Sequence, residues 1–191
     1  MITIYGEQSR PYCRKVIHMA TIVDLPYLCI GEMTEKDRAF VSAVSPNATT
    51  PVICDSDTGV VMCESNAILL YLADKTGQFL PKDKQMRADV YQWLLFESST
   101  LSAAIGELYH YFCAAPVDIP YALDRGQKRI LRCMEIIDNR LANRDYICGE
   151  ASIADVAIEP WVHILEELTD VPMAVFQHVS AWSGRMDKLC R

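Results

Sequence analysis

Two short segments of the chain carry polar groups at a spacing that suits the binding of a peptide, Thr50-Pro51-Val52 and Glu64-Ser65. A cis bond before Pro51 would turn the chain and leave the backbone of Val52 facing a groove, where an extended ligand could pair with it as an added strand does. Ser65 stands where a helix begins, so its N–H and hydroxyl could hold a carboxylate, while Glu64 could receive an ammonium. The pair would therefore bind the α-amino-acid end of a peptide. An ordinary helix cap is its alternative role.

The elements that must position these groups follow from the apolar pattern of the first residues. A short apolar run over residues 2–5 predicts a strand, and apolar side chains at helical spacing over residues 13–22 predict a helix with Pro11 as its first residue. A second apolar run over residues 27–30 completes a strand–helix–strand unit. Such a unit normally makes its two strands parallel neighbours.

A second unit follows a linking segment. Residues 51–54 and 60–63 flank the polar loop Asp55–Gly59 and predict a hairpin. Residues 65–77 then predict a helix that ends at a glycine. The order β-α-β, a linking segment and β-β-α is that of the thioredoxin fold. We therefore expect an α/β thioredoxin-like domain over residues 1–80.

Beyond Pro81 the strand signals fade, and apolar side chains repeat at helical spacing in three stripes. The third stripe opens with Ser152 and Asp155, spaced as in a capping box, and contains Pro160, where a bend is expected. The chain is therefore expected to end in an all-helical bundle domain over residues 81–191. The stripes are Val90, Trp93, Leu94, Glu97, Leu101, Ile105 and Leu108; Ile130, Met134, Ile137 and Leu141; and Ala157, Trp161, Ile164 and Leu168.

The composition argues against several classes of protein. The net charge of −7 at pH 7, with acidic residues in excess on both sides of Leu80, lacks the basic footprint of a nucleic-acid-binding protein. No apolar run approaches the roughly 20 residues that span a bilayer, and the first residues lack the features of a signal peptide, so we expect a cytoplasmic protein without a membrane anchor. Eight cysteines and four histidines are scattered along the chain, which favours reduced thiols and no metal site.

Several motifs resemble those of the cytosolic glutathione transferases. They are the thioredoxin-like order, TTPV at residues 49–52, ESNAILLYLADKTGQFLP from Glu64 and GEASIADVAIEPWV from Gly149. The segment YFCAAPVDIPYALDRGQKRILR is further similar to the bacterial nu class, which includes glutathione-dependent disulfide-bond oxidoreductases. The resemblance covers nearly the whole chain.

The resemblance implies how glutathione would be held as a co-substrate. The backbone of Val52 would pair with its cysteinyl part, Thr50 would border it, and Glu64 and Ser65 would bind its γ-glutamyl group. Arg132 falls on the basic residue with which the helical domain of the family reaches this site. It could equally be an exposed charge among its basic neighbours. Members of the family pair as homodimers, and the same is expected here.

A further group must stabilise the glutathione thiolate, and two candidates follow the first strand. In this superfamily a hydroxyl, thiol or amide at that place donates a hydrogen bond to the sulfur and lowers the thiol pKa from about 8.5. Ser9 is placed to do so or to cap the helix, and Arg10 could stabilise the thiolate by its charge instead. Arg10-Pro-Tyr-Cys13 resembles a glutaredoxin CPYC motif with Arg10 in place of the nucleophilic cysteine. We therefore expect Cys13 to be a packing residue.

Two departures from the family pattern weaken the expected thiol site. Pro11 stands where the nu class has an asparagine, which removes a side-chain donor. Thr49 and Thr50 stand where the family has a basic–aliphatic pair before the cis proline. The glycyl carboxylate of glutathione therefore loses an expected partner. Arg38 or Lys36 could replace that partner, or both could belong to a solvated face.

The leading hypothesis is an enzyme that ionises the thiol of glutathione and delivers the sulfur to a small electrophile, or uses it to reduce a disulfide or peroxide. Aromatic residues such as Tyr109, Tyr111, Phe112 and Trp161 could line the pocket for the second substrate, although aromatic side chains at helical spacing also fit a core. One alternative is a regulatory or scaffolding protein of the same fold with weak catalysis. Another is a glutaredoxin-like enzyme that relies on Cys13.

Overall fold

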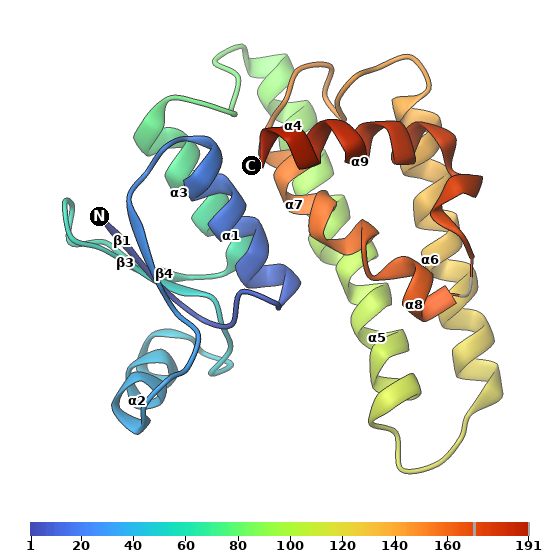
Figure 1. Ribbon diagram of the computed structural model, residues 1–191, viewed down its shortest axis with the longest axis horizontal. Coiled ribbons are helices and arrows are strands. Elements are labelled where there is room, and N and C mark those ends of the chain that lie inside the picture. Colours follow the sequence, from blue (N-terminus) through green and yellow to red (C-terminus); the bar gives the residue numbers. More distant parts are fainter. Residues whose placement is uncertain (170, 191) are drawn as a thin grey trace. The chain divides into compact units, whose positions relative to one another are not determined.

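The structure is a computed structural model that describes residues 1–169 and 171–190, except for the side chains of residues 166 and 167 (Figure 1). Contacts divide the chain into two compact units, named here the sheet unit (Met1–Pro81 with Asp187–Arg191) and the helical unit (Lys82–Met186). The independent domains expected over residues 1–80 and 81–191 stay a prediction.

Four strands form the sheet unit's single sheet, in the spatial order β2-β1-β3-β4. β1 lies parallel to β2 and antiparallel to β3, and β3 lies antiparallel to β4. The strands are β1 (Ile2–Tyr5), β2 (Tyr27–Ile30), β3 (Val52–Asp55) and β4 (Val61–Cys63). This mixed sheet, joined by helices in the expected order, confirms the thioredoxin-like fold of the first part of the chain.

The helices of the sheet unit have ends that the local sequence explains. α1 starts at Pro11, which suits the first helical position because the first N–H of a helix has no partner within it. α3 ends at Gly77, whose φ of 69° lies in the left-handed region that glycine enters at little cost. The helices are α1 (Pro11–Ile22), α2 (Glu35–Val44) and α3 (Ser65–Thr76).

The linking segment contains a helix, α2, that the apolar pattern did not predict. Thr34 begins it with a capping box. The Asp37 N–H donates to the Thr34 hydroxyl at 3.2 Å, and the Thr34 N–H donates to the Asp37 carboxylate at 2.9 Å. These two bonds satisfy backbone donors that a helix start leaves without partners. The signal for this helix was therefore its cap and not its apolar side chains.

A buried core holds the ends of these elements in place. α1 and α3 pack against each other and lie side by side in Figure 1, whereas α2 stands apart from them. Residues 50–52 lead into β3, and residues 64–65 lead into α3. Both elements contribute to this core, so burial nearby anchors the backbone of these residues. Core side chains with no exposed surface include those of Ile2, Ile4, Val16, Ile53, Ile68, Leu69 and Leu72.

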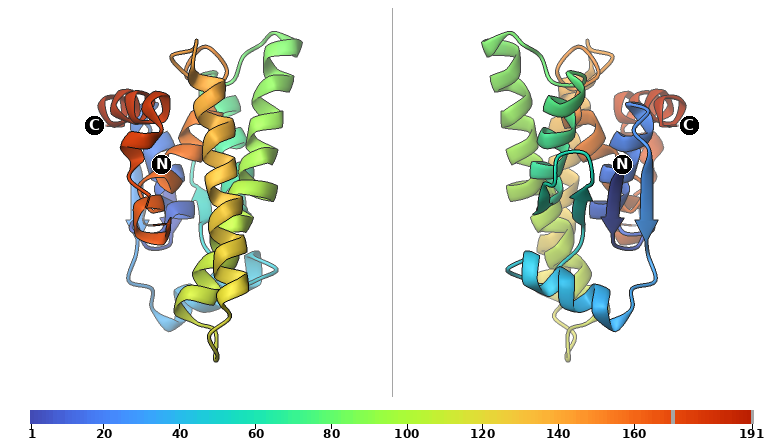
Figure 2. Two further views of the ribbon diagram at one scale, coloured as in Figure 1. Left: turned by 90° about the vertical axis from the view of Figure 1, so that its right-hand side faces the viewer. Right: turned by 90° about the vertical axis from the view of Figure 1, so that its left-hand side faces the viewer.

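Helices dominate the described part of the helical unit, which confirms the all-helical class expected for it. α5 and α6 pack together. In the left view of Figure 2 the long helix α6 lies in front. In the described chain no helix has the length and apolarity that a membrane crossing needs. The elements are α4 (Lys84–Phe96), the π-helical turn η1 (Glu97–Leu101), α5 (Ser102–Cys113), α6 (Pro120–Leu141), α7 (Ile153–Val162), α8 (Leu165–Thr169), the 3-10 turn η2 (Met173–Val175) and α9 (Gln177–Leu189).

The three predicted stripes meet different outcomes. The stripe of α6, from Ile130 to Leu141, is buried as expected. The first stripe continues from α4 into α5, but η1 interrupts it with one π-helical turn. The third stripe divides between α7 and α8, because α7 ends at Val162, two residues after Pro160. The bend expected at Pro160 is therefore a break between two helices.

The start of α7 confirms the predicted capping box. The backbone N–H and hydroxyl of Ser152 both donate to the Asp155 carboxylate at 3.0 Å, and the Ala154 N–H donates to the Ser152 hydroxyl at 3.3 Å. Both Ser152 and Asp155 are buried. This box is therefore part of the core of the helical unit and not a surface cap.

Candidate functional site

Val52 is the first residue of β3 and stands at the end of its ladder, opposite Tyr5 of β1 and Cys63 of β4. The Thr50–Pro51 bond that precedes it is cis, as expected. Val52 has no exposed surface, in its backbone or in its side chain. Strands β1 and β4 flank Val52 on both sides, and its pairing with a bound peptide stays a prediction.

Glu64 and Ser65 lie where α3 begins. Ser65 is the first helical residue and is 8% exposed, whereas Glu64 is exposed. Glu64 has a φ of 69° and makes no side-chain capping bond. The capping role that we weighed for this pair is therefore not realised by Glu64. A glutamate at positive φ costs on the order of 1–3 kcal/mol, and such strain concentrates at ligand-binding sites.

A buried lysine lies next to this helix start, and the sequence analysis missed it. Lys15 of α1 has no exposed surface, and its Nζ donates to Oδ1 of Asn66 at 2.9 Å. Asn66 directly follows Ser65, so the bond ties α1 to the first turn of α3. A lysine at a core position of an apolar stripe was the signal that could have found it. The positive charge of Lys15 also adds to the positive end of the α3 dipole.

Ser9 and Arg10 lie in the exposed loop between β1 and α1. Arg10 directly precedes α1, and no side chain caps the start of this helix. The Ser9 hydroxyl makes no hydrogen bond to any residue that the structure describes, so the capping role weighed for Ser9 is not realised either. Arg10 places its Nε 3.5 Å from a Glu7 carboxylate oxygen, and both side chains are more than half exposed. The two candidate activating groups are thus open to a ligand.

Cys13 is a packing residue, as expected. It is fully buried, and its Sγ lies 3.7 Å from the Thr50 hydroxyl oxygen. Burial raises the pKa of the Cys13 thiol to about 11, although the bond to Thr50 opposes the shift. A thiol with such a pKa carries very little thiolate at neutral pH. The position therefore does not support a glutaredoxin-like nucleophile.

A pocket of about 530 Å³ opens beside the carboxyl ends of β1 and β2, where ligands of open α/β sheets commonly bind. Its lining residues are Glu7, Gln8, Gly31, Glu32, Met33 and Arg38. Arg38 makes no ion pair to any described residue. Thr49, in contrast, is used locally, because its N–H donates to the Ser45 hydroxyl at 3.1 Å. Of the two positions weighed for a carboxylate partner, Arg38 lines this pocket and Lys36 does not.

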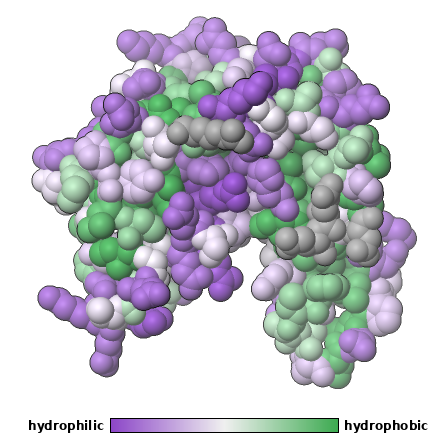
Figure 3. Space-filling view, viewed as in Figure 1, coloured by the Kyte–Doolittle hydropathy of each residue, from purple (hydrophilic) through white to green (hydrophobic). Residues whose placement is uncertain are grey.

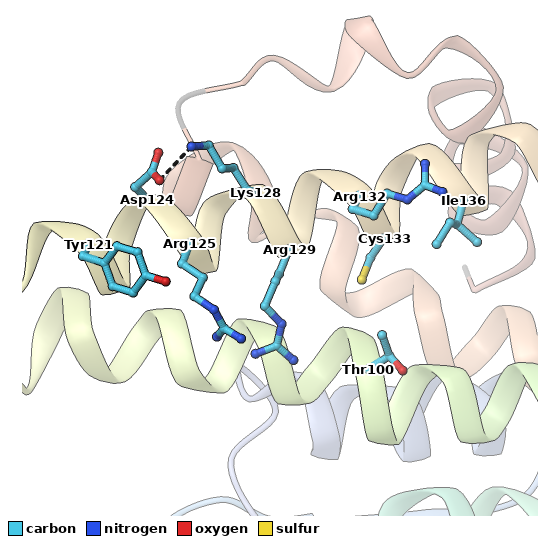
Figure 4. A pocket seen from close by; sticks show the side chains of 9 residues that line it. All are labelled: Thr100, Tyr121, Asp124, Arg125, Lys128, Arg129, Arg132, Cys133 and Ile136. Carbon is cyan, nitrogen blue, oxygen red and sulfur yellow. Dashed lines mark hydrogen bonds and ion pairs between the residues drawn. The ribbon is translucent and has the colours of Figure 1, made fainter.

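Arg132 lies on α6 of the helical unit. Its guanidinium is 3.1 Å from a Glu135 carboxylate oxygen, and its side chain is 69% exposed. It lines a second pocket together with Arg125, Lys128 and Arg129 (Figure 4). The contact with glutathione that the family resemblance implies for Arg132 stays a prediction.

The aromatic residues considered for a second-substrate pocket do not share one environment. Trp161 is 3% exposed, and its Nε1 donates to a carboxylate oxygen of the fully buried Glu97 at 2.6 Å. Tyr109 and Phe112 are exposed at 50% and 61%. Trp161 therefore belongs to the core of the helical unit.

Comparison with known proteins gives the family of the chain. Residues 5–79 match the family model "Glutathione S-transferase, N-terminal domain", and residues 106–189 match "Glutathione S-transferase, C-terminal domain". The disulfide-bond oxidoreductase YfcG of Escherichia coli is 38% identical over 149 residues, which span 75% of this chain and 69% of that protein. The disulfide-bond oxidoreductase YghU of the same organism is 34% identical over 81% of this chain, which spans only 56% of YghU.

A solved structure agrees with these matches over the full chain. The glutathione transferase from Pseudomonas putida with one glutathione disulfide bound per subunit has a TM-score of 0.85 and 28% identity, and the match covers 100% of this chain and 90% of that one. Both halves of the family resemblance are thereby confirmed. The chain belongs to the glutathione S-transferase family, in the bacterial group that includes disulfide-bond oxidoreductases.

Proposed function

We propose that the protein binds glutathione in the sheet unit and transfers its sulfur, with disulfides as the preferred second substrate. The observation that carries this proposal is the helix start at Glu64-Ser65, where an exposed carboxylate is held at positive φ beside the first N–H groups of α3. Glu64 would accept the γ-glutamyl ammonium. Ser65 and the helix N-terminus would hold the γ-glutamyl carboxylate. The backbone of Val52 and the neighbouring Thr50 would bind the cysteinyl part of glutathione.

Two residues of the β1–α1 loop compete for the role of thiolate stabiliser. The Ser9 hydroxyl would donate a hydrogen bond to the sulfur, and the Arg10 guanidinium would attract the negative charge. Either interaction favours the thiolate and so lowers the thiol pKa of bound glutathione. Ser9 has no competing partner among the described residues, whereas Arg10 has Glu7 at 3.5 Å. This difference favours Ser9 for direct contact.

Arg38 is the residue that we propose for the glycyl carboxylate. It lines the pocket at the ends of β1 and β2, and it has no ion pair within the described part of the chain. A guanidinium can bind a carboxylate through two parallel hydrogen bonds. We also propose that Arg132 contacts bound glutathione, as the family resemblance implies.

A disulfide suits the chemistry of this chain because no redox-active cysteine pair is needed. The glutathione thiolate would attack one sulfur of the disulfide, form a mixed disulfide and release the other sulfur as a thiolate. The names of YfcG and YghU and the bound glutathione disulfide of the Pseudomonas structure support this preference. We further propose a cytoplasmic homodimer, with small electrophiles and peroxides as lesser substrates.

A regulatory or scaffolding protein of the same fold is the second candidate. It is favoured by Pro11, which removes a side-chain donor from the thiol site, and by the use of Thr49 in a local turn. Such a protein would bind glutathione without turning over a mixed disulfide or an aryl halide. Activity assays with both substrates separate the two candidates.

Isothermal titration with glutathione tests the binding site, and we expect saturation in the millimolar range. Glu64→Gln and Ser65→Ala should each weaken binding roughly tenfold, which corresponds to about 1.4 kcal/mol. Glu150→Gln, an exposed glutamate of the helical unit, is the matched control and should bind as the unaltered protein does. Absence of heat with the unaltered protein would remove the enzyme proposal. Disulfide reduction that survives both Ser9→Ala and Arg10→Ala would show that another group stabilises the thiolate.

A further inference from the structure

One edge of the sheet ends in a strand that has a neighbouring strand on one side only. β2 stands at the end of the strand order, and the right view of Figure 2 shows it (blue) as the outer strand beside β1 (dark blue). A strand at the edge of a sheet presents backbone N–H and C=O groups to which a further strand can bind. We name this strand, Tyr27–Ile30, the β2 edge. The glutathione contacts proposed above do not involve it.

The register of β1 and β2 tells which backbone groups of the β2 edge face outward. Ile2 stands opposite Tyr27, and the Ile2 N–H donates to the Pro26 carbonyl at 3.0 Å. In a parallel pair a residue bonds to the two residues that flank its opposite neighbour, so the even-numbered residues of β2 bond to β1. The N–H and C=O groups of Tyr27 and Cys29 therefore face away from the sheet. Neither residue makes a further backbone bond within the described part of the chain.

The sequence of the β2 edge does not block a further strand. Natural proteins protect exposed edges with charged side chains, above all lysine, with proline or with a bulge. The four residues of β2 include no charged residue and no proline, and their register with β1 is continuous. Tyr27 and Leu28 are exposed at 38% and 50%. Hydrophobic colours gather in Figure 3 over the part of the sheet unit where Figure 1 draws the blue strand β2, so an added strand would cover apolar surface.

The side chains of the β2 edge alternate between the two faces of the sheet. Tyr27 lies on the face of α1, where the Thr21 hydroxyl donates to its hydroxyl oxygen at 3.4 Å. Cys29 lies on the same face, and its thiol donates to the Gly6 carbonyl at 3.4 Å. Burial raises the pKa of the Cys29 thiol, so this cysteine carries little thiolate and is a poor nucleophile toward a disulfide beside it. Leu28 lies on the opposite face, where its side chain is open to a neighbour.

The β2 edge leads into the pocket beside the proposed thiol site. Gly31 directly follows β2 and lines this pocket of about 530 Å³ together with Glu7. A carboxylate oxygen of Glu7 lies 3.5 Å from Nε of Arg10, one of the two candidate thiolate stabilisers. Strands of a sheet lie about 4.8 Å apart, so a strand added to β2 would lie roughly 10 Å from β1. The end of such a strand therefore brings a cysteine side chain to the pocket.

We propose that the β2 edge binds an extended segment of the polypeptide whose disulfide is exchanged, and that this segment adds to the sheet as a further strand. The inference rests on the proposed function and names its substrate class, a disulfide carried on a peptide chain. Main-chain hydrogen bonds give strand addition its affinity, so peptides of many sequences fit. Because β2 has only four residues, few such bonds form and the product leaves readily. A pocket of this volume accepts a whole small ligand, so a cysteine side chain fits beside the glycyl end of glutathione.

The reaction at this site is a thiol–disulfide exchange. With a peptide whose cysteine is joined to glutathione, the thiolate of bound glutathione attacks the glutathione sulfur of the mixed disulfide. An S–S bond forms between the two glutathione molecules, and the S–S bond to the peptide breaks. The peptide leaves as a thiolate, which takes up a proton from water. One disulfide replaces another, so the reaction needs no further oxidant or reductant.

Steady-state kinetics with a short peptide of alternating valine and threonine, which carries one cysteine joined to glutathione, test the proposal. Two isomers of this peptide carry N-methyl groups on the valine nitrogens only or on the threonine nitrogens only. The N–H groups of alternate residues face the same edge of a strand, and a strand pairs with β2 through one edge. We therefore expect one isomer to lose roughly tenfold in kcat/KM and the other to keep its value. Equal values for the two isomers would overturn the proposal.

Leu28→Lys gives the β2 edge the charge that protects natural edges. It should lower kcat/KM for the peptide several-fold and leave the rate with the mixed disulfide of free cysteine and glutathione unchanged, because that substrate is too small to reach the edge. Val175→Lys, at an exposed valine of the helical unit, is the matched control. An unchanged peptide rate in Leu28→Lys would contradict the proposal. Loss of the peptide reaction in Cys29→Ser would also contradict it, because the Cys29 thiol would then capture the peptide covalently. The N-methyl isomers need only the unaltered protein, so they serve if Leu28→Lys melts at a lower temperature.

The small mixed disulfide separates this inference from the proposed function. If the unaltered protein and glutathione do not exchange it, the proposed function fails. Strand addition is then measured without chemistry, by fluorescence anisotropy of the labelled peptide with serine in place of its cysteine. Binding that one N-methyl pattern weakens and the other does not supports the β2 edge as a peptide site. Equal binding of the two isomers, or no binding of the parent peptide, overturns it.

Discussion

Among the described residues, the sheet unit and the helical unit each bury one aspartate, and they compensate its charge in different ways. Asp55 of β3 accepts hydrogen bonds from the Lys75 ammonium and from the Tyr71 hydroxyl at 2.6 Å. Asp155 of α7 accepts hydrogen bonds from neutral donors, the Ile147 N–H, the Ser152 N–H and hydroxyl, and the Trp182 indole, all at 2.8–3.0 Å. The Asp55 carboxylate therefore has a cation as a partner, whereas the Asp155 carboxylate has neutral hydrogen-bond donors.

The pKa values of the two carboxyl groups shift in opposite directions. Burial alone would raise the pKa of Asp55, but the bonds from Lys75, Tyr71 and the Asp57 N–H outweigh it and hold the pKa well below its usual range. Burial raises the pKa of Asp155, and its four hydrogen bonds oppose the shift without reversing it. Two differences set the sign of the shift: the cation beside Asp55 favours its charged form, and the deeper burial of Asp155 disfavours its charged form.

Removal of the buried helical carboxylate should have the largest effect. Asp155→Ala leaves three backbone or indole N–H groups and one hydroxyl without their acceptor in a fully buried place, and each such donor costs about 1–3 kcal/mol. We expect the free energy of unfolding to fall by roughly 4 kcal/mol, measured by urea denaturation followed by circular dichroism. Glu150→Ala, at an exposed position nearby in sequence, is the control and should change little. A loss below about 1 kcal/mol would contradict a structural role for this network.

Asp55→Asn should cost about half as much, roughly 2 kcal/mol. The amide keeps the shape and one acceptor oxygen but loses the charge that attracts Lys75. Lys75 retains a second carboxylate, since its Nζ also lies 3.0 Å from Asp57. Circular dichroism during urea denaturation measures the loss. Asp57→Asn, at an exposed side chain, is the matched control and should cost clearly less than Asp55→Asn.

The stability lost in Asp55→Asn and the stability lost in Asp155→Asn should depend on pH in opposite directions. The pKa of Asp55 is lowered on folding, so its stabilisation is present above the unfolded value of about 3.9 and is lost as the pH falls toward the folded value. The pKa of Asp155 is raised, so its contribution is complete below about 3.9 and declines as the pH rises through the folded value. The cost of Asp55→Asn should therefore shrink in acid, and the cost of Asp155→Asn should shrink toward neutrality.

Urea midpoints between pH 3 and pH 7 for the unaltered protein and both asparagine variants measure this difference. Parallel curves for the two variants would mean that the cation on Asp55 and the neutral donors on Asp155 are not what distinguishes them. Addition of 0.5 M salt sharpens the comparison. It should reduce the penalty at Asp55, where Lys75 is 18% exposed, more than at the fully buried Asp155 network.

The sequence predicts these two networks unequally. The spacing of Ser152 and Asp155 predicts a capping box, but Trp182 and Ile147 reach the same carboxylate only through the folded chain. The sequence predicts Asp55 as a residue of the hairpin loop, and no residue near it in the sequence indicates that Lys75 is its partner. Side chains that meet across long stretches of chain leave no local pattern, which is why burial of these charges is a property of the structure.

The candidate site shows the same division. The order of strands and helices and the positions of Glu64 and Ser65 follow from local patterns and from the family resemblance. The positive φ of Glu64 and the buried bond of Lys15 to Asn66 do not, because a backbone angle and a distant partner have no signature in residue types. The π-helical turn η1 is hidden for another reason. Its buried residues, Glu97 and Leu101, are four apart and so continue the helical stripe across it.

The apolar pattern did not predict the helix α2, because the signal for this helix is its capping box. The smallest loss of stability that we predict concerns that box. Thr34→Ala removes the hydroxyl that accepts the Asp37 N–H, and loss of such an acceptor costs about 1 kcal/mol. Thr34→Ser keeps the oxygen and should restore nearly all of the stability in urea denaturation. Ser152→Ala, the same change in the buried box of α7, should cost more, because water cannot replace the lost acceptor there. Equal costs for the two alanine variants would mean that burial does not separate the boxes of the two units.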